Sequence, residues 1–424
     1  MKIAILGGGL AGISLAYFLQ EKDSVAEISI FEKEENLGGL CRSFSHQGIP
    51  VDIGPHIFFS KNQNILSFML SVMGHNKRQL RRSNRIIHKG RFVQYPFEND
   101  LSKLPPEDIE RCLHGFLNNP YRSYPANNML QFFFITFGEG ITNLYLRPYN
   151  EKIWKFDPAF MDTQMVERIP RPPDEDIIRS ANGETIDGYL HQLYFYYPMR
   201  GGTESFIQAF AGLLHGKVNI HLGEKVLTAG DGIIKTAKGH YTADTIVSCI
   251  PPQEIADDDI RPTIDCLKYN GIIIAVATLN VDRAGDNFAF MVADNDVIFH
   301  RISKIDFLGG NYHQEGTATF LMEYTYRKGD RIASLSDDSL QLAFMEGLRK
   351  IGFMETEKEI TAFTIKRFPY AYVIYDIHHK ETMGTIRKYF AQKGIQLNGR
   401  FGNFEYWNMD KVIIESKKVA ERLL

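Results

Sequence analysis

The chain opens with a short run of apolar residues, 2–6, of the kind that becomes a buried parallel strand. A glycine cluster at 7–12 follows it and leads into a stretch with helical spacing that continues to Gln20. A second apolar run, 28–31, ends at Glu32. This order predicts a βαβ unit, in which a helix joins two parallel strands.

Two other patterns occupy the rest of the chain. Prolines and acidic residues at 105–108 begin a helical pattern that continues to about residue 165. From about residue 271 the pattern is typical of strands, with β-branched and aromatic residues in three runs: 272–281, 317–326 and 361–367. A helical stretch at 336–350 interrupts these runs, and helical spacing returns after Asp410. The pattern therefore indicates an α/β region, a helical region and a mostly antiparallel sheet.

Composition limits the class of protein. With 424 residues, 44% of them hydrophobic and 23% charged, the chain has the balance of a globular protein of two or three lobes. A net charge of −3 provides no basic excess and argues against a nucleic-acid partner. The four cysteines lack metal-ligand spacing, so we expect neither a metal site nor a disulfide scaffold. We expect no membrane span and no signal peptide either, which favours the cytoplasm.

The glycine cluster has the spacing of a dinucleotide site. Gly7, Gly9 and Gly12 form a GxGxxG motif between the first strand and the first helix, and Glu32 lies 20 residues beyond Gly12. Glycines at these positions let a pyrophosphate approach the helix N-terminus, while the acidic residue accepts a hydrogen bond from a ribose hydroxyl. The motif in this context predicts that a dinucleotide binds here.

A second glycine pair favours FAD over NAD as that dinucleotide. Residues 38–42, Gly-Gly-Leu-Cys-Arg, follow Glu32 closely and resemble the extension found in FAD-binding flavoproteins of the amine oxidase and protoporphyrinogen oxidase group. We therefore predict an α/β fold in which a Rossmann-like FAD-binding lobe is interleaved with a helical lobe and a mostly antiparallel β-sheet lobe. The expected segments are 1–65, 200–265 and 385–424 for the FAD lobe, 100–190 for the helical lobe, and 66–99, 191–199 and 266–384 for the sheet lobe.

Seven blocks, in order over nearly the whole chain, resemble the UDP-galactopyranose mutase family, and its eukaryotic type more than the short bacterial one. They are residues 52–60, 95–99, 147–154, 167–168, 197–203, 299–301 and 399–410. The resemblance implies an isomerase that interconverts the pyranose and furanose forms of a nucleotide-diphosphate sugar, with UDP-galactose as the favoured substrate. It places this reaction in the synthesis of cell-surface polysaccharide or lipopolysaccharide precursors.

The family's chemistry implies that FAD must be reduced. N5 of the reduced flavin attacks the anomeric carbon and expels the diphosphate, and the sugar opens and recloses as a flavin adduct before the diphosphate returns. A reductant is therefore an expected partner, either NAD(P)H or a reduced-flavin donor. The sequence identifies neither that donor nor the oligomeric state.

The resemblance also implies roles for individual residues. Arg168 and Arg301 match the arginines that bind the diphosphate, and Tyr372 and Tyr406 match the tyrosines that assist them. His56 lies on the loop that faces the flavin. These five residues form the expected catalytic set, because a departing diphosphate requires fixed cations and hydroxyl donors.

The remaining site residues fall into a cofactor set and a substrate set. The cofactor set is Gly7, Gly9, Leu10, Ala11, Gly12, Glu32, Lys33, Gly39, Leu40, Arg42, His56, Val226, Arg400, Asn408, Met409 and Asp410. The substrate set is Tyr95, Glu98, Tyr145, Asn150, Trp154 and Phe290, together with Arg168, Arg301, Tyr372 and Tyr406. Arg400 is expected to anchor FAD, and a helix starting near 408–410 to stabilise negative charge on the reduced flavin. The region of Tyr95, with Asn150 and Trp154, is expected to hold the base.

Several residues depart from the family pattern. Glu98 stands where the eukaryotic-type enzymes have a glutamine beside the uracil, and Tyr145 and Phe290 stand where a phenylalanine and a tyrosine are common. Pro55 replaces a glycine next to His56 and should stiffen that loop. A carboxylate cannot donate a hydrogen bond as an amide does unless it is protonated, so these changes bear on which base and sugar bind.

Two other functions fit the same FAD lobe. A flavin oxidase or dehydrogenase of the amine oxidase or protoporphyrinogen oxidase type would need no diphosphate clamp, so Arg301 and its partners argue against it. A binding protein without flavin, as in the Rab GDP-dissociation inhibitors, would not need Glu32 or the 38–42 extension. The mutase is therefore the favoured interpretation, with the oxidase as its alternative.

Overall fold

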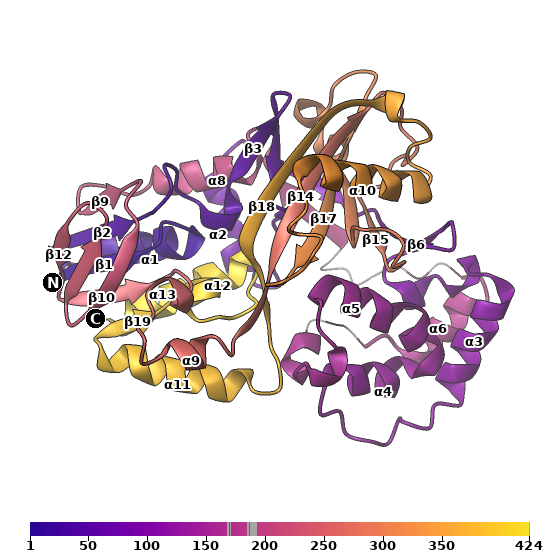
Figure 1. Ribbon diagram of the computed structural model, residues 1–424, viewed down its shortest axis with the longest axis horizontal. Helices are drawn as coiled ribbons and strands as arrows, with labels where there is room; N and C mark the ends of the chain where they lie inside the picture. The colour runs from indigo at the N-terminus through magenta and orange to yellow at the C-terminus, as the bar shows by residue number, and fades with distance from the viewer. Residues whose placement is uncertain (168, 170, 185, 187–192, 424) are drawn as a thin grey trace.

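The computed structural model of the chain describes residues 1–167, 169, 171–184, 186 and 193–423. Figure 1 shows an α/β lobe that carries both termini, a long twisted sheet and a helical lobe at the far end from the termini. The predicted fold class is confirmed, since a parallel sheet with a Rossmann-like βαβ start is combined with a mostly antiparallel sheet and a group of helices.

A five-stranded parallel sheet forms the centre of the α/β lobe. Its strands, in spatial order, are β19 (Ile395–Leu397), β13 (Thr245–Ser248), β1 (Lys2–Leu6), β2 (Glu27–Phe31) and β9 (Val218–His221). The side chains of Ile5, Ile30 and Val247 are fully buried in one core with Leu15 and Val419, and Ala4 and Phe31 are buried in a different core with Ile234, so both faces of the sheet are covered. This double coverage explains why the first strand of the sequence is a continuous apolar run.

Seven helices among the described residues lie in the same lobe as this sheet. They are α1 (Leu10–Gln20), α2 (Gln63–Met73), α8 (Gly202–Ala211), α9 (Arg261–Ile264), α11 (His379–Gln392), α12 (Gly399–Gly402) and α13 (Met409–Arg422). α1 packs beside α13, and a Cβ atom on Gly12 would lie 2.0 Å from the carbonyl oxygen of Gly7. Only glycine allows the helix to approach the end of β1 this closely.

The segments that form each lobe differ slightly from those expected. Met69 and Met73 of α2 pack with Phe206 of α8 and Val412 of α13, so α2 belongs with the α/β lobe although the sequence boundary was set at residue 65. α11 begins at His379, six residues before the expected boundary at 385, and contacts β19. In both cases an amphipathic helix continues past the point where the sequence pattern changes.

A seven-stranded sheet forms the second lobe. Its strands, in spatial order, are β18 (Ile360–Ile374), β14 (Lys268–Leu279), β17 (Ala318–Tyr326), β16 (Arg301–Lys304), β15 (Ala289–Val292), β6 (Asn84–His88) and β7 (Arg91–Gln94). All its pairings are antiparallel except β15 with β6. Helix α10 (Asp337–Lys350) packs beside it with Leu340, Phe344 and Leu348 in the same core as Phe290.

The third lobe is helical. It contains α3 (Pro106–Leu117), α4 (Met129–Ile141), a π-helical segment (Thr142–Leu146), α5 (Arg147–Trp154) and α6 (Asp174–Ala181). Phe132 and Phe133 are buried in its core, as expected for the aromatic block in this segment. No helix among the described residues combines the length and apolar character needed to cross a bilayer.

Smaller strands accompany these lobes. They are the hairpin of β3 (Ser43–His46) and β4 (Ile49–Asp52), the pair of β5 (Arg78–Arg81) and β8 (Tyr194–Tyr197), and the three-stranded sheet of β10 (Val226–Gly230), β11 (Ile233–Thr236) and β12 (His240–Thr242). The buried ring of His46 bonds Thr364 of β18 at 2.7 Å and Thr278 of β14 at 3.0 Å. The hairpin of the α/β lobe is thereby fixed to the large sheet.

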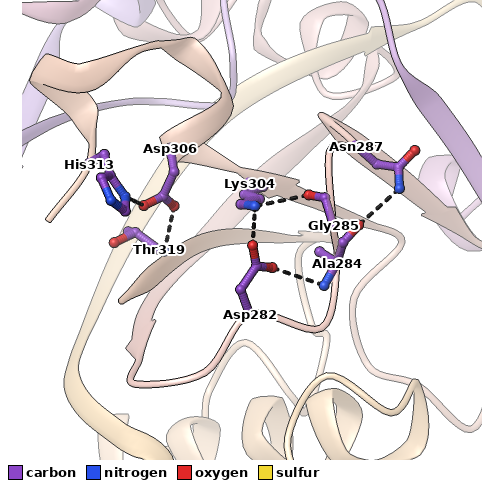
Figure 2. A network of polar contacts seen from close by, with 8 residues as sticks. All are labelled: Asp282, Ala284, Gly285, Asn287, Lys304, Asp306, His313 and Thr319. Carbon is purple, nitrogen blue, oxygen red and sulfur yellow. Dashed lines mark hydrogen bonds and ion pairs between the residues drawn. The ribbon is translucent and has the colours of Figure 1, made fainter. Parts of the chain in front are cut away.

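A polar network holds the loop that leads into β15 (Figure 2). Lys304 of β16 pairs with Asp282 and donates a hydrogen bond to the carbonyl of Gly285 at 2.9 Å. Asn287 donates to the carbonyl of Ala284 at 2.9 Å. Because this loop immediately precedes β15, the network helps to fix that strand in the sheet.

We expect Lys304→Met to lower the free energy of unfolding by about 1–3 kcal/mol, because one largely buried ammonium satisfies both a carboxylate and a carbonyl. The side chain of Lys304 is only 11% exposed. Urea unfolding of the holoenzyme measures the change. Lys418→Met is the matched control, since its pair with Glu415 is on the surface and should contribute no more than about 0.5 kcal/mol. Equal effects of the two substitutions would contradict this role of the network.

Candidate functional site

One cavity of about 790 Å³ runs from the glycine motif of the α/β lobe to the strands of the large sheet. Its walls come from the β1–α1 turn, the loop after β4, strand β18 and the start of α13. Most of the predicted site residues line it: Gly7, Gly9, Leu10, Ala11, Glu32, Lys33, Gly39, Leu40, Arg42, His56, Tyr95, Val226, Arg301, Tyr372, Arg400, Tyr406, Asn408, Met409 and Asp410. The fold thus gathers segments from the beginning, middle and end of the sequence around one space.

The cofactor end of the cavity has the shape that a dinucleotide needs. Gly7 has a positive φ of 102°, and a Cβ on Gly9 would meet nothing nearer than Gly39 Cα at 3.8 Å, so the turn leaves open space before α1. The carboxylate of Glu32 is oriented by backbone N–H groups, at 2.8 Å from Gly8 and 3.0 Å from Glu34. Gly9 caps α1 without a side chain, which leaves the helix N-terminus available to a pyrophosphate.

These features fit FAD. Arg42 pairs with Glu34 at 3.2 Å and donates to the Gly39 carbonyl at 3.1 Å, so the second glycine pair is held beside the first. At the other end of the cofactor region, α13 begins at Met409, where its N-terminus can stabilise negative charge. FAD bound here would supply flavin chemistry between the glycine motif and the large sheet.

His56 lies on the cavity wall in a loop that hydrogen bonds of Asp52 and Thr203 hold in place. Asp52 accepts hydrogen bonds from Ser43 at 2.7 Å, Tyr197 at 2.7 Å and both the N–H and the hydroxyl of Thr203, at 2.9 and 2.5 Å. The Thr203 hydroxyl also reaches the His56 carbonyl at 3.2 Å. Burial lowers the pKa of His56, with the charge of Asp52 acting in the opposite direction, so the imidazole is neutral at pH 7. Its Nδ1 atom is buried with no hydrogen-bond partner among the described residues.

Arg301 lies at the sheet end of the cavity in a two-point ion pair. Its Nε and Nη2 atoms donate to the two carboxylate oxygens of Glu323 at 2.5 and 2.7 Å. Burial disfavours the charge on Arg301, but Glu323 outweighs burial and raises the pKa of the guanidinium. The Tyr372 hydroxyl lies 3.5 Å from the same carboxylate, and burial with the Glu323 charge raises the pKa of that phenol. Both groups therefore stay protonated and act as donors.

Aromatic contacts fix the tyrosines next to Arg301. Trp154, Tyr372 and Tyr406 contact one another with ring centroids 5.5 to 5.8 Å apart. Arg400 lies over the Tyr406 ring at 4.5 Å and donates to the carbonyls of Trp407 at 3.0 Å and Ala371 at 2.6 Å. Arg400 therefore joins β18 to the segment before α13, in addition to lining the cofactor region.

Six predicted residues do not line the cavity. They are Gly12, Glu98, Tyr145, Asn150, Trp154 and Phe290, and all of them are buried. Phe290 lies on β15 between Ala289 and Met291, which do line the cavity, so strand alternation turns Phe290 toward the opposite core with Phe353. The side chain of Asn150 donates a hydrogen bond to the Leu146 carbonyl at 2.7 Å and accepts one from Trp154 Nε1 at 2.9 Å. Arg168 lies outside the described residues.

Tyr145 and Glu98 lie close to the wall although they do not form it. The ring of Tyr145 stacks between Phe97 at 4.8 Å and Tyr149 at 5.3 Å, and Tyr149 lines the cavity. Glu98 follows Phe97 and is 4% exposed. The stack therefore links the π-helical segment of the helical lobe to the cavity.

Three residues at the site were not among the sequence predictions. Glu323 neutralises Arg301, Tyr149 extends the aromatic stack, and Arg82 lines the cavity. A signal for Glu323 was available, because it is an acidic residue inside the otherwise uncharged strand 318–326 and such a residue requires a buried partner. Arg82 belongs to a run of basic residues, which is typical of a solvated surface, so the sequence does not indicate that Arg82 lines a cavity.

Comparisons with known proteins agree with this architecture. The family model for an NAD(P)-binding Rossmann-like domain matches residues 5–71. The coproporphyrinogen III oxidase of Staphylococcus aureus is 34% identical over 100% of this chain and 98% of its own length. The UDP-galactopyranose mutase of Mycoplasma genitalium is 24% identical over 50% of this chain and 52% of its own length.

The fold has a close counterpart among solved structures. A structure of reduced UDP-galactopyranose mutase superposes with a TM-score of 0.90, covering 100% of this chain and 95% of that one at 23% identity. At this identity the likeness concerns the fold. Together with the full-length relative and the dinucleotide motif, it identifies FAD as the cofactor. The chain belongs to the FAD-dependent oxidoreductase family of the coproporphyrinogen III oxidase, within the amine oxidase and protoporphyrinogen oxidase superfamily.

Proposed function

We propose that the protein is a flavin-dependent mutase that interconverts the pyranose and furanose forms of a nucleotide-diphosphate sugar, with UDP-galactose as the favoured substrate. The observation that carries the proposal is the group of Arg301, Tyr372 and Tyr406 on one wall of the cavity that also contains the dinucleotide motif. An oxidase needs no donors for a departing diphosphate. The product would be a furanose donor for cell-surface polysaccharide or lipopolysaccharide synthesis.

Arg301 is suited to bind the diphosphate. A guanidinium has five N–H donors, and the bonds to Glu323 use two of them. The ion pair holds the guanidinium in one orientation, so the side chain loses little conformational entropy when a phosphate binds to the remaining donors. The charge is then fixed where negative charge increases as the anomeric bond breaks.

The tyrosines supply neutral donors beside this cation. Burial and the nearby carboxylate keep the Tyr372 hydroxyl protonated, so it can donate to a phosphate oxygen. Tyr406 contacts both Tyr372 and Trp154, which keeps the pair rigid. Reduced FAD would supply the nucleophile for the anomeric carbon without net electron transfer. His56, neutral and hydrogen-bonded through its carbonyl, would face that reaction without adding a charge.

Helix α5 supports the substrate wall. Lys152 donates to the carbonyls of Val292 at 3.0 Å and Asp294 at 2.6 Å. Asn270 of β14 donates to the Trp154 carbonyl at 2.8 Å. These bonds tie α5 to the large sheet, so Tyr149 and Trp154 keep fixed positions beside the tyrosine pair. We propose that the base lies between this helix and Tyr95.

A flavin oxidase acting on a porphyrinogen is the second candidate. The observation that favours it is the full-length relative, since the enzyme of Staphylococcus aureus is named for oxidation of coproporphyrinogen III. The two reactions differ in their use of electrons. The oxidase consumes an electron acceptor with each turnover, whereas the mutase needs reduced flavin and consumes none.

Assays under two conditions distinguish the candidates. Dithionite-reduced protein is incubated without oxygen with UDP-galactose or UDP-galactofuranose, and the ring forms are separated by chromatography. Air-oxidised protein is incubated with coproporphyrinogen III, and porphyrin fluorescence is recorded. We expect isomerisation in the first assay and no porphyrin in the second. The reverse result, or isomerisation by fully oxidised enzyme, would exclude the proposed mechanism.

We expect Arg301→Lys to reduce kcat by roughly 10–100-fold, because the lysine keeps a charge near Glu323 but loses the planar fork that presents donors to the diphosphate. Lysine is preferred to alanine as the test, since Arg301→Ala would leave the fully buried Glu323 carboxylate unpaired. Tyr372→Phe should reduce kcat by about tenfold, which corresponds to the loss of one hydrogen bond to a charged group. Steady-state kinetics of the reduced enzyme measures both effects.

FAD content is the internal control for these variants. Neither residue belongs to the dinucleotide motif, so the ratio of flavin to protein should equal that of the wild type. Arg91→Lys, an exposed residue of β7, should leave kcat unchanged. Loss of flavin in Arg301→Lys would mean that the residue acts on the cofactor instead of the substrate.

We expect the free energy of unfolding to fall as the pH rises from about 4.5 to about 7, because burial raises the pKa of Glu98 in the folded protein from its usual 4.5 to about 7. Within this window the folded state binds the proton and the unfolded state does not, so each pH step favours unfolding. Across this pH window the free energy of unfolding of the wild type should fall by up to roughly 3 kcal/mol relative to that of Glu98→Gln, which cannot titrate. Urea unfolding of both proteins at pH 4.5, 5.5, 6.5 and 7.5 measures the difference. Parallel pH profiles would show that Glu98 has an ordinary pKa.

A further inference from the structure

A buried carboxylate lies directly behind one wall of the cavity. Asp52 is 2% exposed and ends β4, and the residues that follow it, 53–56, all line the cavity. Its charge acts on the Cys41 thiol and on the His56 imidazole, two groups that also line the cavity. Asp52 does not itself line the cavity, so it can act on a bound cofactor only through its charge and through the position of the wall.

Every hydrogen bond that Asp52 accepts within the described residues comes from a neutral donor. Oδ1 accepts from the Ser43 hydroxyl at 2.7 Å and from the Thr203 N–H at 2.9 Å. Oδ2 accepts from the hydroxyls of Tyr197 at 2.7 Å and Thr203 at 2.5 Å. Four donors fit an ionised carboxylate, which only accepts hydrogen bonds. Thr203 lies in the first turn of α8, and the N-terminus of a helix also favours a negative charge.

The charge of Asp52 is balanced differently from that of other buried carboxylates. Among the described residues no lysine or arginine forms an ion pair with Asp52, whereas the buried carboxylates Glu323 and Asp108 pair with Arg301 and Lys89. Neutral donors stabilise a carboxylate but leave its net charge in place. In a buried site such a charge acts over several ångströms, because little water is present to screen it. Asp52 is therefore a fixed negative charge next to the cavity.

Cations and a helix N-terminus act on the same region with the opposite sign. The charges of Arg301 and Arg400 act on His56 against that of Asp52. Helix α13 begins at Met409, and its first turn also lines the cavity. These groups favour the negative charge of a reduced flavin, and Asp52 opposes it. The electron affinity of a flavin bound here is thus set by the difference between the two effects.

We propose that Asp52 is a positioning residue of the flavin site, which fixes wall residues 53–56 against α8 and lowers the reduction potential of bound FAD through its charge. A negative charge beside the flavin opposes the addition of electrons. The same charge favours the positive charge that develops on the sugar as the anomeric bond breaks. The effect on the potential requires only bound FAD, whereas the effect on the sugar rests on the proposed function.

Two kinds of substitution separate the charge of Asp52 from its hydrogen bonds. Asp52→Asn removes the charge at nearly constant shape. Its amide oxygen can accept from the Thr203 N–H, and the hydroxyls of Tyr197 and Thr203 can rotate to accept from its NH2 group. Asp52→Ser is a second charge-removing variant, with space for a water molecule among the same donors. Ser43→Ala is the matched control, because it removes one hydroxyl donor and keeps the carboxylate.

The test measures the midpoint potential of the holoenzyme at pH 7 by equilibration with a reference dye, with flavin absorbance as the readout. Asp52→Asn and Asp52→Ser should each shift the potential to a more positive value. We expect a change of about tenfold or more in the equilibrium between oxidised and reduced flavin, which is about 30 mV for a two-electron couple. Ser43→Ala should keep the wild-type potential or shift it to a more negative value, because the charge remains and one dipole that offsets it is lost.

The control variant distinguishes an effect of charge from an effect of structure. An unchanged potential in the charge-removing variants would overturn the proposal. A positive shift of equal size in Ser43→Ala would overturn it as well, because a disturbed hairpin and not the charge would then be responsible. The comparison uses variants that bind FAD at the wild-type ratio, and either Asp52→Asn or Asp52→Ser alone is sufficient.

Failure of the mutase proposal gives a different result. If the wild type shows no isomerisation but the charge-removing variants have a more positive potential, the nucleotide-sugar function is contradicted and the effect of Asp52 on the flavin is retained. If the wild type isomerises UDP-galactose, Asp52→Asn should reduce kcat by about tenfold at a similar KM, because Asp52 does not line the substrate cavity. An unchanged kcat would overturn the effect on the sugar.

Discussion

The substrate end of the site depends on one buried ion pair. Arg301 and Glu323 are directly opposite each other on β16 and β17, so the register of two antiparallel strands places a cation and an anion in contact. Neither charge would be tolerated there alone, since a buried ion without its partner costs several kcal/mol. The pair in turn orients Tyr372, which comes from β18 on the far side of β14. Strand register is therefore the constraint that assembles the donors.

Local features of the fold could be predicted from the sequence. The strand Lys2–Leu6, the glycine turn and the helix after it are encoded within about 20 consecutive residues, and the apolar runs that became β14, β17 and β18 were recognisable by their length and composition. The position of α3 followed from prolines and acids in its first turn.

Features that depend on pairing between distant segments could not be predicted in this way. The parallel contact of β15 with β6 joins residues about 200 positions apart, and no local pattern encodes it. The side on which a strand residue lies depends on register, and a shift of one residue reverses it. Phe290 was expected at the site from the family resemblance, and the register of β15 turns it toward the opposite core instead.

The interleaving of the lobes has a consequence for biosynthesis. The parallel sheet gains its edge strand β19 only from residues 395–397, and Asn408–Asp410 complete the wall of the cavity. A nascent chain on the ribosome can form β1, α1 and β2 early, but its glycine turn would face an incomplete pocket until these residues emerge. Stable retention of the cofactor should thus be a late event in synthesis, after residues 395–410 have left the ribosome.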